Sequence, residues 1–183
     1  MSEERARAAL EASGIDFTIT RHGPVGSLDE AAAARGIDPA NIVKTLVVRR
    51  GDDDYLFVLV PGDRTISWPK LRALLGVSRL SMPDKDVARE VTGYERGTIT
   101  PFGSTTAWPV VADTRVVFRE AGSTAAESAV GQDETVVDLL GEPGGAAPLV
   151  SIGGGAFGVA ATVDGARLAA VLGAQVADVT EPV

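Results

Sequence analysis

The sequence has no cysteine and a single histidine, His22. Without thiols the chain cannot form disulfides, thiolate nucleophiles, cysteine-ligated zinc sites or iron–sulfur clusters. One imidazole also excludes histidine-rich metal sites and leaves at most one Ser-His-Asp arrangement. We therefore predict no metal site and no cofactor, so any catalysis must use other polar groups.

Aromatic residues make up only 5% of the 183 residues, and no apolar run approaches the ~20 residues of a membrane span. Met1 leads into the charged segment Ser2-Glu3-Glu4-Arg5, which is unlike a signal peptide. Hydrophobic residues nevertheless account for 45% and charged residues for 23%, as in folded globular proteins. We expect a single domain over residues 1–183, located in the cytoplasm and without a membrane partner.

The sequence has fewer basic than acidic residues, with 17 Lys and Arg and 25 Asp and Glu, which gives a net charge of −8. This balance argues against a broad basic face that coats nucleic acid nonspecifically, but a local basic patch remains compatible with it. The candidates for such a patch are Arg64, Lys70, Arg72, Arg79, Lys85 and Arg89. The simpler interpretation is that these residues lie on ordinary solvated helix faces.

Short helices and short β-rich runs alternate irregularly along the chain. Capping residues and glycine stops bound helices between Ser2 and Gly14, Ser27 and Gly36, Ser67 and Gly76, and Asp84 and Gly93, and Asp164 caps a last helix over Gly165 to Leu172. Strands are expected at 15–20, 43–48, 55–60, 110–111, 116–118, 149–152, 159–163 and 176–179. This order predicts an α+β fold with a mixed, largely antiparallel sheet, an ordered loop from Gly93 to Pro109, and a surface excursion around 119–148.

Three weak motifs have simpler structural interpretations. Gly153, Gly155 and Gly158 fit the G-x-G-x-x-G pattern, but a strand follows them where a dinucleotide site needs a helix. A glycine loop between two strands is the better interpretation, with N–H groups free to face a ligand. His22 with Ser27 and Asp29 is better explained as a polar loop histidine than as a triad, and Asp52-Asp53-Asp54 as a hairpin turn than as a cation site.

Lys44 interrupts an otherwise apolar segment at the start of a predicted strand. A solvated lysine at a sheet edge and a functional lysine deserve equal weight on spacing alone. A lysine at this place, near glycine loops, is well positioned to hold a carbonyl, phosphate or sugar oxygen.

Taken in order, these motifs resemble the YbaK family, the free-standing relatives of the editing domain inserted in bacterial prolyl-tRNA synthetases. The resemblance spans nearly the whole chain. It rests on His22-Gly23-Pro24, Ser27-Leu28-Asp29-Glu30-Ala31-Ala32, Gly36-Ile37, Val43-Lys44-Thr45-Leu46-Val47, Val60-Pro61-Gly62-Asp63, Thr92-Gly93-Tyr94-Glu95-Arg96-Gly97, Thr100-Pro101-Phe102-Gly103, Val111-Ala112-Asp113 and Val150-Ser151-Ile152-Gly153.

The resemblance implies a single compact α+β domain with a barrel-like sheet and short flanking helices. It also implies a trans-editing deacylase that hydrolyses the ester of a misacylated tRNA, typically tRNA for proline. The partners it implies are the aminoacylated 3′ end of tRNA and, transiently, an aminoacyl-tRNA synthetase. Lys44 corresponds to the key pocket lysine of the family, Gly103 to the glycine of its P-x-G loop, and Ser151 to the serine before its late glycine loop.

An aminoacyl ester is already activated, so hydrolysis needs little beyond positioning and oxyanion stabilisation. We expect Lys44 to be catalytic by orienting the carbonyl or the terminal ribose. The expected substrate-binding residues are Pro101, Gly103, Ser151, Gly153, Gly154 and His22. A non-catalytic module that holds a tRNA end or a small ligand in the same pocket is the alternative.

The late loop, Gly153 to Gly158, departs from the family pattern. Many family members carry a basic residue in this loop, whereas this chain has only glycine, alanine and phenylalanine there. The loop therefore offers no cation of its own for contact with a tRNA backbone.

Overall fold

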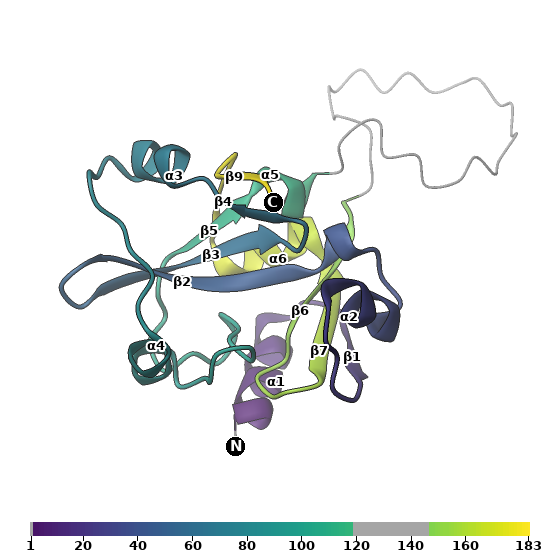
Figure 1. Cartoon of the computed structure of the whole chain (residues 1–183). Coiled ribbons are helices and arrows are strands. Elements are labelled where there is room, and N and C mark those ends of the chain that lie inside the picture. Colours follow the sequence, from purple (N-terminus) through teal and green to yellow (C-terminus); the bar gives the residue numbers. More distant parts are fainter. Residues whose placement is uncertain (1, 119–146) are drawn as a thin grey trace, which may run out of the picture.

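The computed structural model describes residues 2–118 and 147–183, which form an α+β fold with three separate β-sheets (Figure 1). The largest sheet has the strand order β2-β3-β5-β8. Its strands are β2 (Val43–Gly51), β3 (Asp54–Pro61), β5 (Val110–Asp113) and β8 (Gln175–Ala177). The pair β2 and β3 is antiparallel, whereas β5 runs parallel to both β3 and β8.

The hairpin of β2 and β3 divides the core into two clusters. Strand β3 is buried along nearly its whole length, as expected for an apolar strand covered on both faces. Alternate residues of β2 point to opposite faces, so Val43 and Val47 join one cluster while Leu46 and Val48 join the other. The same alternation places Lys44 and Thr45 on opposite faces.

A second, antiparallel sheet has the order β1-β7-β6, formed by Phe17–Arg21, Val159–Asp164 and Leu149–Gly153. The glycine loop joins β6 to β7 as a hairpin, which confirms the prediction of a loop between two strands. Because β7 follows the glycines where a dinucleotide site needs a helix, this loop does not have the architecture of such a site.

The described strands do not close into a barrel, so the barrel-like expectation is wrong in that respect. The second sheet meets the first through an isolated bridge between Ile42 and Ser151, and this single bridge does not extend into a continuous ladder. A third sheet, β4 (Arg64–Ile66) with β9 (Thr180–Pro182), is separate from both.

Short helices surround the sheets, and several begin at the caps predicted from the sequence. Ser27 Oγ accepts the N–H of Glu30, and Asp84 and Asp164 cap in the same way, whereas Ser67 makes no side-chain cap. No helix in the described part is long and apolar enough to cross a membrane. The helices are α1 (Ser2–Ser13), α2 (Leu28–Arg35), a 3-10 turn η1 (Pro39–Asn41), α3 (Trp68–Leu75), α4 (Lys85–Thr92), α5 (Thr114–Val117) and α6 (Gly165–Leu172).

Two predictions of local structure differ from the fold. The strand expected at 116–118 is wrong, because α5 forms there after Asp113, whose carboxylate accepts the N–H of Arg115 and starts the helix. Strands β4 and β9 were not predicted, since each is short and is stabilised by pairing with a segment far away in the chain. The surface excursion expected around 119–148 lies almost entirely outside the described residues.

Candidate functional site

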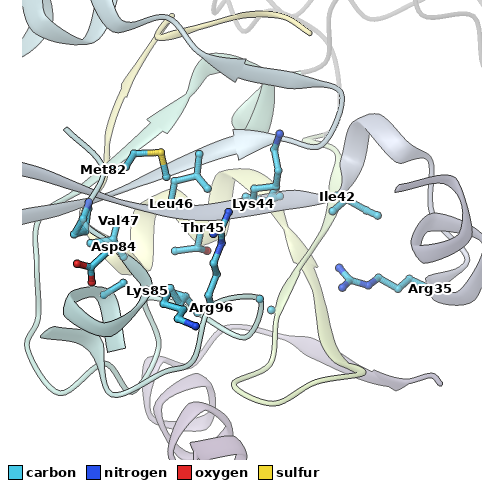
Figure 2. Close-up of a pocket in the computed structure, with 16 residues that line it drawn as sticks. Arg35, Ile42, Lys44, Thr45, Leu46, Val47, Met82, Asp84, Lys85 and Arg96 are labelled. Atoms are coloured by element: carbon cyan, nitrogen blue, oxygen red, sulfur yellow. The ribbon is translucent and has the colours of Figure 1, made fainter. Parts of the chain in front are cut away.

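A cavity of about 470 Å³ lies beside the first half of β2 (Figure 2). Residues 42–47 form one wall, and residues 82–85 with Ala88 of α4 form another. Arg35 at the end of α2, the loop residues Arg96, Gly97 and Ile99, and Gly153 complete the lining. This volume is in the range of pockets that hold small ligands.

The cavity carries a positive charge in a protein whose net charge is −8. Four cationic residues line it, namely Arg35, Lys44, Lys85 and Arg96. Among the described residues, Asp84 is the only carboxylate residue in the lining, and its Oδ1 accepts the N–H groups of residues 86 and 87 at the start of α4. The charge distribution therefore favours an anionic ligand in this cavity.

Most of the candidates for a local basic patch lie away from the cavity. Of the six candidates only Lys85 lines the cavity. Arg64 Nε donates to Thr180 Oγ1 at 2.7 Å, and Lys70 Nζ lies 2.9 Å from the carboxylate of Asp178. These two side chains hold the C-terminal segment in place.

Lys44 lines the cavity through its place near the start of β2, and its ammonium is partly enclosed. Nζ donates to the backbone oxygen of Arg64 at 2.5 Å. Partial burial lowers the pKa of Lys44, and the nearby carboxylate of Asp63 opposes this effect without cancelling it. Figure 2 shows the amine on one side of β2 and the side chain of Thr45 on the other.

Thr45 was not singled out from the sequence. Its Oγ1 is buried and has no hydrogen-bond partner among the described residues, and Thr45 lines the cavity. A buried hydroxyl without a partner costs about 1–3 kcal/mol. A ligand in the cavity is therefore one way to satisfy this group, and its position directly after Lys44 is the only signal for it in the sequence.

Arg35 connects two residues that the sequence analysis proposed separately. Ser151 is fully buried in β6, and its Oγ accepts a hydrogen bond from Arg35 Nη1 at 3.3 Å. Arg35 Nε donates to His22 Nε2 at 3.4 Å, and the other ring nitrogen of His22 lies 2.8 Å from the oxygen of Gly23. The tautomer that fits both contacts carries the hydrogen on Nδ1, which donates to the oxygen of Gly23, and accepts at Nε2 from Arg35.

The same contacts do not support a triad of His22 with Ser27 and Asp29. Within the described part, the ring nitrogens of His22 are engaged by Arg35 and Gly23. The hydroxyl of Ser27 caps α2 instead.

The late glycine loop is closely packed. Gly153 lines the cavity, and a Cβ there would lie 3.0 Å from the backbone oxygen of Ile99. The N–H of Gly154 donates to the oxygen of Val159 at 2.9 Å within the hairpin. A Cβ on Gly155 would come within 2.8 Å of the oxygen of Ser2 in α1. These glycines permit close backbone approach, and the N–H of Gly154 is already used.

Gly103 and Pro101 do not line the cavity. Gly103 has φ +73°, and a Cβ there would lie 2.6 Å from the oxygen of Arg5. Arg5 Nε in turn donates to the oxygen of Gly103 at 2.5 Å, and its guanidinium lies 4.6 Å from the ring centroid of Tyr94. This contact fastens α1 to the 93–109 loop, and the substrate-binding role of Gly103 and Pro101 stays a prediction.

No group of three or more His, Asp or Glu residues in the described ranges is arranged to hold a metal ion. The described residues of the cavity lining offer cationic side chains, a hydroxyl and backbone groups.

Known proteins resemble this chain over most of its length. The model of the aminoacyl-tRNA editing domain matches residues 22–130. Among curated relatives, the proline–tRNA ligase of Thermosipho melanesiensis is 37% identical over 83 residues, and that of Heliobacterium modesticaldum is 35% identical over 91 residues. These matches cover 45% and 50% of this chain but only 14% and 16% of the ligases.

Solved structures extend the similarity to the full length. A protein described as a proposed trans-editing enzyme for prolyl-tRNA synthetase is 28% identical, with a TM-score of 0.72, covering 98% of this chain and 97% of its own. The hypothetical protein APE2540 has the same fold, with a TM-score of 0.74 at 23% identity over 97% of this chain and 99% of its own. These matches confirm the resemblance derived from the motifs, and the chain belongs to the aminoacyl-tRNA editing domain family.

Proposed function

We propose that this protein hydrolyses the ester bond of a misacylated tRNA, with tRNA for proline as its substrate. The observation that carries the proposal is the cationic cavity beside Lys44 in an otherwise acidic protein. A tRNA end is polyanionic, so such a cavity attracts it even though most of the surface does not. The matched segments of proline–tRNA ligases support the choice of tRNA and a transient association with that synthetase.

In this proposal Lys44 holds the carbonyl oxygen or the terminal ribose. A protonated lysine has three N–H donors, and the contact with the oxygen of Arg64 uses one of them. The remaining donors are available to an ester oxygen as negative charge develops on it. Charge-assisted donors placed in this way each contribute on the order of 10²–10³ in rate.

The rest of the reaction needs water and orientation. The backbone around Gly153 supplies polar groups on the cavity wall, whereas the hydroxyl of Thr45 is buried on the other side of β2 from the amine of Lys44. An aminoacyl ester is reactive enough that a thiol or imidazole nucleophile is unnecessary. This agrees with a chain that has no cysteine and whose only histidine hydrogen-bonds to Arg35 and Gly23.

The test is a panel of mischarged tRNAs incubated with the wild-type protein and with Lys44→Ala. We expect the variant to lose about 100-fold or more in deacylation rate, by the loss of oxyanion stabilisation. Lys70→Ala is the matched control, because Lys70 forms an exposed ion pair with Asp178 outside the cavity. Wild-type rates in Lys44→Ala would exclude this role for Lys44.

A non-catalytic module that binds the tRNA end is the second candidate. In favour of this candidate, Asp84, the only carboxylate residue in the described part of the lining, caps α4. The described lining therefore has no unengaged carboxylate that could act as a base. Tight binding of a mischarged tRNA without release of its amino acid would select this candidate.

A further inference from the structure

Of the four cationic residues in the described lining of the cavity, Arg35 has the surroundings least like those of a surface residue. Its side chain is half-buried, while those of Lys85 and Arg96 are exposed. Desolvation lowers the pKa of Arg35 from the ordinary arginine value. Among the described residues its hydrogen-bond partners are Ser151 Oγ and His22 Nε2, both at 3.3 Å or more, and neither is a carboxylate. A partly desolvated guanidinium without a carboxylate is costly unless an anion joins it.

The fold places Arg35 in this position from two sides. Arg35 is the last residue of α2, and Gly36 ends that helix with φ +66°. The side chain then reaches from α2 toward β6, where Ser151 lies (Figure 2). A cation at a helix C-terminus is stabilised by the helix dipole, which offsets part of the desolvation cost.

Ser151 orients this guanidinium from behind the cavity wall. Its oxygen accepts from Arg35 Nη1, but Ser151 itself is fully buried and does not line the cavity. Arg35 does line the cavity, so the remaining N–H groups of its guanidinium are the donors available there. A tetrahedral oxyanion such as phosphate accepts such donors well, since planar guanidinium groups bind phosphate through two parallel hydrogen bonds.

We propose that Arg35, oriented by Ser151, forms a subsite for a nucleotide phosphate, the one that joins the terminal aminoacylated nucleotide to the rest of the tRNA. Its assignment to that nucleotide rests on the proposed function, whereas phosphate binding itself does not. Arg35 acts as a positioning residue that sets how far the tRNA end enters the cavity. The late loop, residues 153–158, has no basic side chain, so a cation on α2 provides the charge beside it.

The test compares the binding of adenosine 5′-monophosphate and adenosine by isothermal titration calorimetry, with no reaction involved. We expect the wild-type protein to bind the monophosphate about 10- to 100-fold more tightly, as charge-assisted hydrogen bonds imply. Arg35→Gln should remove this preference, and Arg35→Lys should keep part of it because the charge remains without the fork. Thermal unfolding of each variant checks that it is folded.

Arg89→Gln is the matched control, because Arg89 is exposed on α4 beside Glu95 and does not line the cavity. It should keep the wild-type preference. Equal binding of the two ligands by the wild-type protein, or no measurable binding of either, would overturn the subsite. A preference that survives in Arg35→Gln would also overturn it and assign the phosphate to Lys85 or Arg96.

The outcome is independent of the proposed reaction. A wild-type protein that prefers the monophosphate through Arg35 but hydrolyses no mischarged tRNA supports the subsite and rejects the deacylase. A protein that hydrolyses the ester without any phosphate preference supports the deacylase and rejects the subsite.

Discussion

The glycine-rich loops and the cationic cavity both consist of residue types that often bind ligands, yet they do different work. In the loops, Gly103 and Gly155 lie where a side chain would collide with the backbone of α1, and the N–H of Gly154 is used within its own hairpin. In the cavity, Arg35 has no carboxylate partner and Thr45 Oγ1 has no hydrogen-bond partner among the described residues. The closely packed glycines hold the fold together, whereas a half-buried guanidinium without a carboxylate partner favours an anionic ligand in the cavity.

The largest expected effect concerns the closely packed glycines of the loops. Gly103→Ala should lower the free energy of unfolding by about 3 kcal/mol or more, because it adds a clash with the oxygen of Arg5 to the cost of a positive φ. Gly36→Ala is the matched control, with φ +66° and no atom within 4 Å of the added Cβ, and should cost only about 1 kcal/mol. Urea unfolding measures both. Equal losses would mean that the contact with α1 contributes nothing.

A smaller effect concerns the charge of Lys44. Its pKa is lowered in the folded protein, so the amine loses its proton below pH 10.5, the ordinary lysine value. If the ammonium stabilises the developing oxyanion, kcat/KM corrected for spontaneous hydrolysis should fall with rising pH, beginning below 10.5. The residual activity of Lys44→Ala should lack this decrease. A decrease of the same shape in both proteins would assign it to another group.

The lowered pKa of Lys44 also affects the stability of the protein, which should rise with pH while the activity falls. Since the folded pKa is below the unfolded one, the unfolded chain binds more protons between the two values, and stability contributed by this site rises with pH through that window. Lys44→Met should therefore lose this rise. Thermal unfolding of both proteins between pH 8 and pH 11 measures it, with the wild type gaining relative to the variant.

The smallest effect concerns the exposed side of the cavity. Arg96→Gln should weaken tRNA binding only a few-fold and reduce the slope of log affinity against log salt concentration by about one, as expected for a single phosphate contact. Arg89→Gln, outside the cavity, should leave the slope unchanged. Identical slopes for the wild-type protein and Arg96→Gln would remove Arg96 from the tRNA contact.

Local signals in the sequence were sufficient for much of the fold. The caps at Ser27, Asp84 and Asp164 and the hairpin around residues 51–54 act over a few residues, and all of them were predicted. The failures depend on distant partners or on a competing cap. Strands β4 and β9 form because residues 64–66 meet residues 180–182, and α5 forms where β-branched residues suggested a strand.

The candidate site was predicted only in part, for the same reason. Lys44 was identified because a lysine inside an apolar run is unusual and because the surrounding motif resembles the editing family. Arg35 had no such signal, since an arginine at the end of a helix is ordinary. Its meaning comes from the burial of its guanidinium between β6 and His22, which no spacing in the sequence reveals.

The sequence alone determined the family, the α+β class, the helix caps and the absence of thiol chemistry, because each depends on residue identity or on neighbours close in the chain. Only the tertiary structure decided where charge is left without a partner. An acidic chain of net charge −8 gathers four cations around one cavity, and they come from α2, β2, α4 and the 93–109 loop. Burial and long-range packing set the electrostatic character of that cavity, and neither is a property of any local segment.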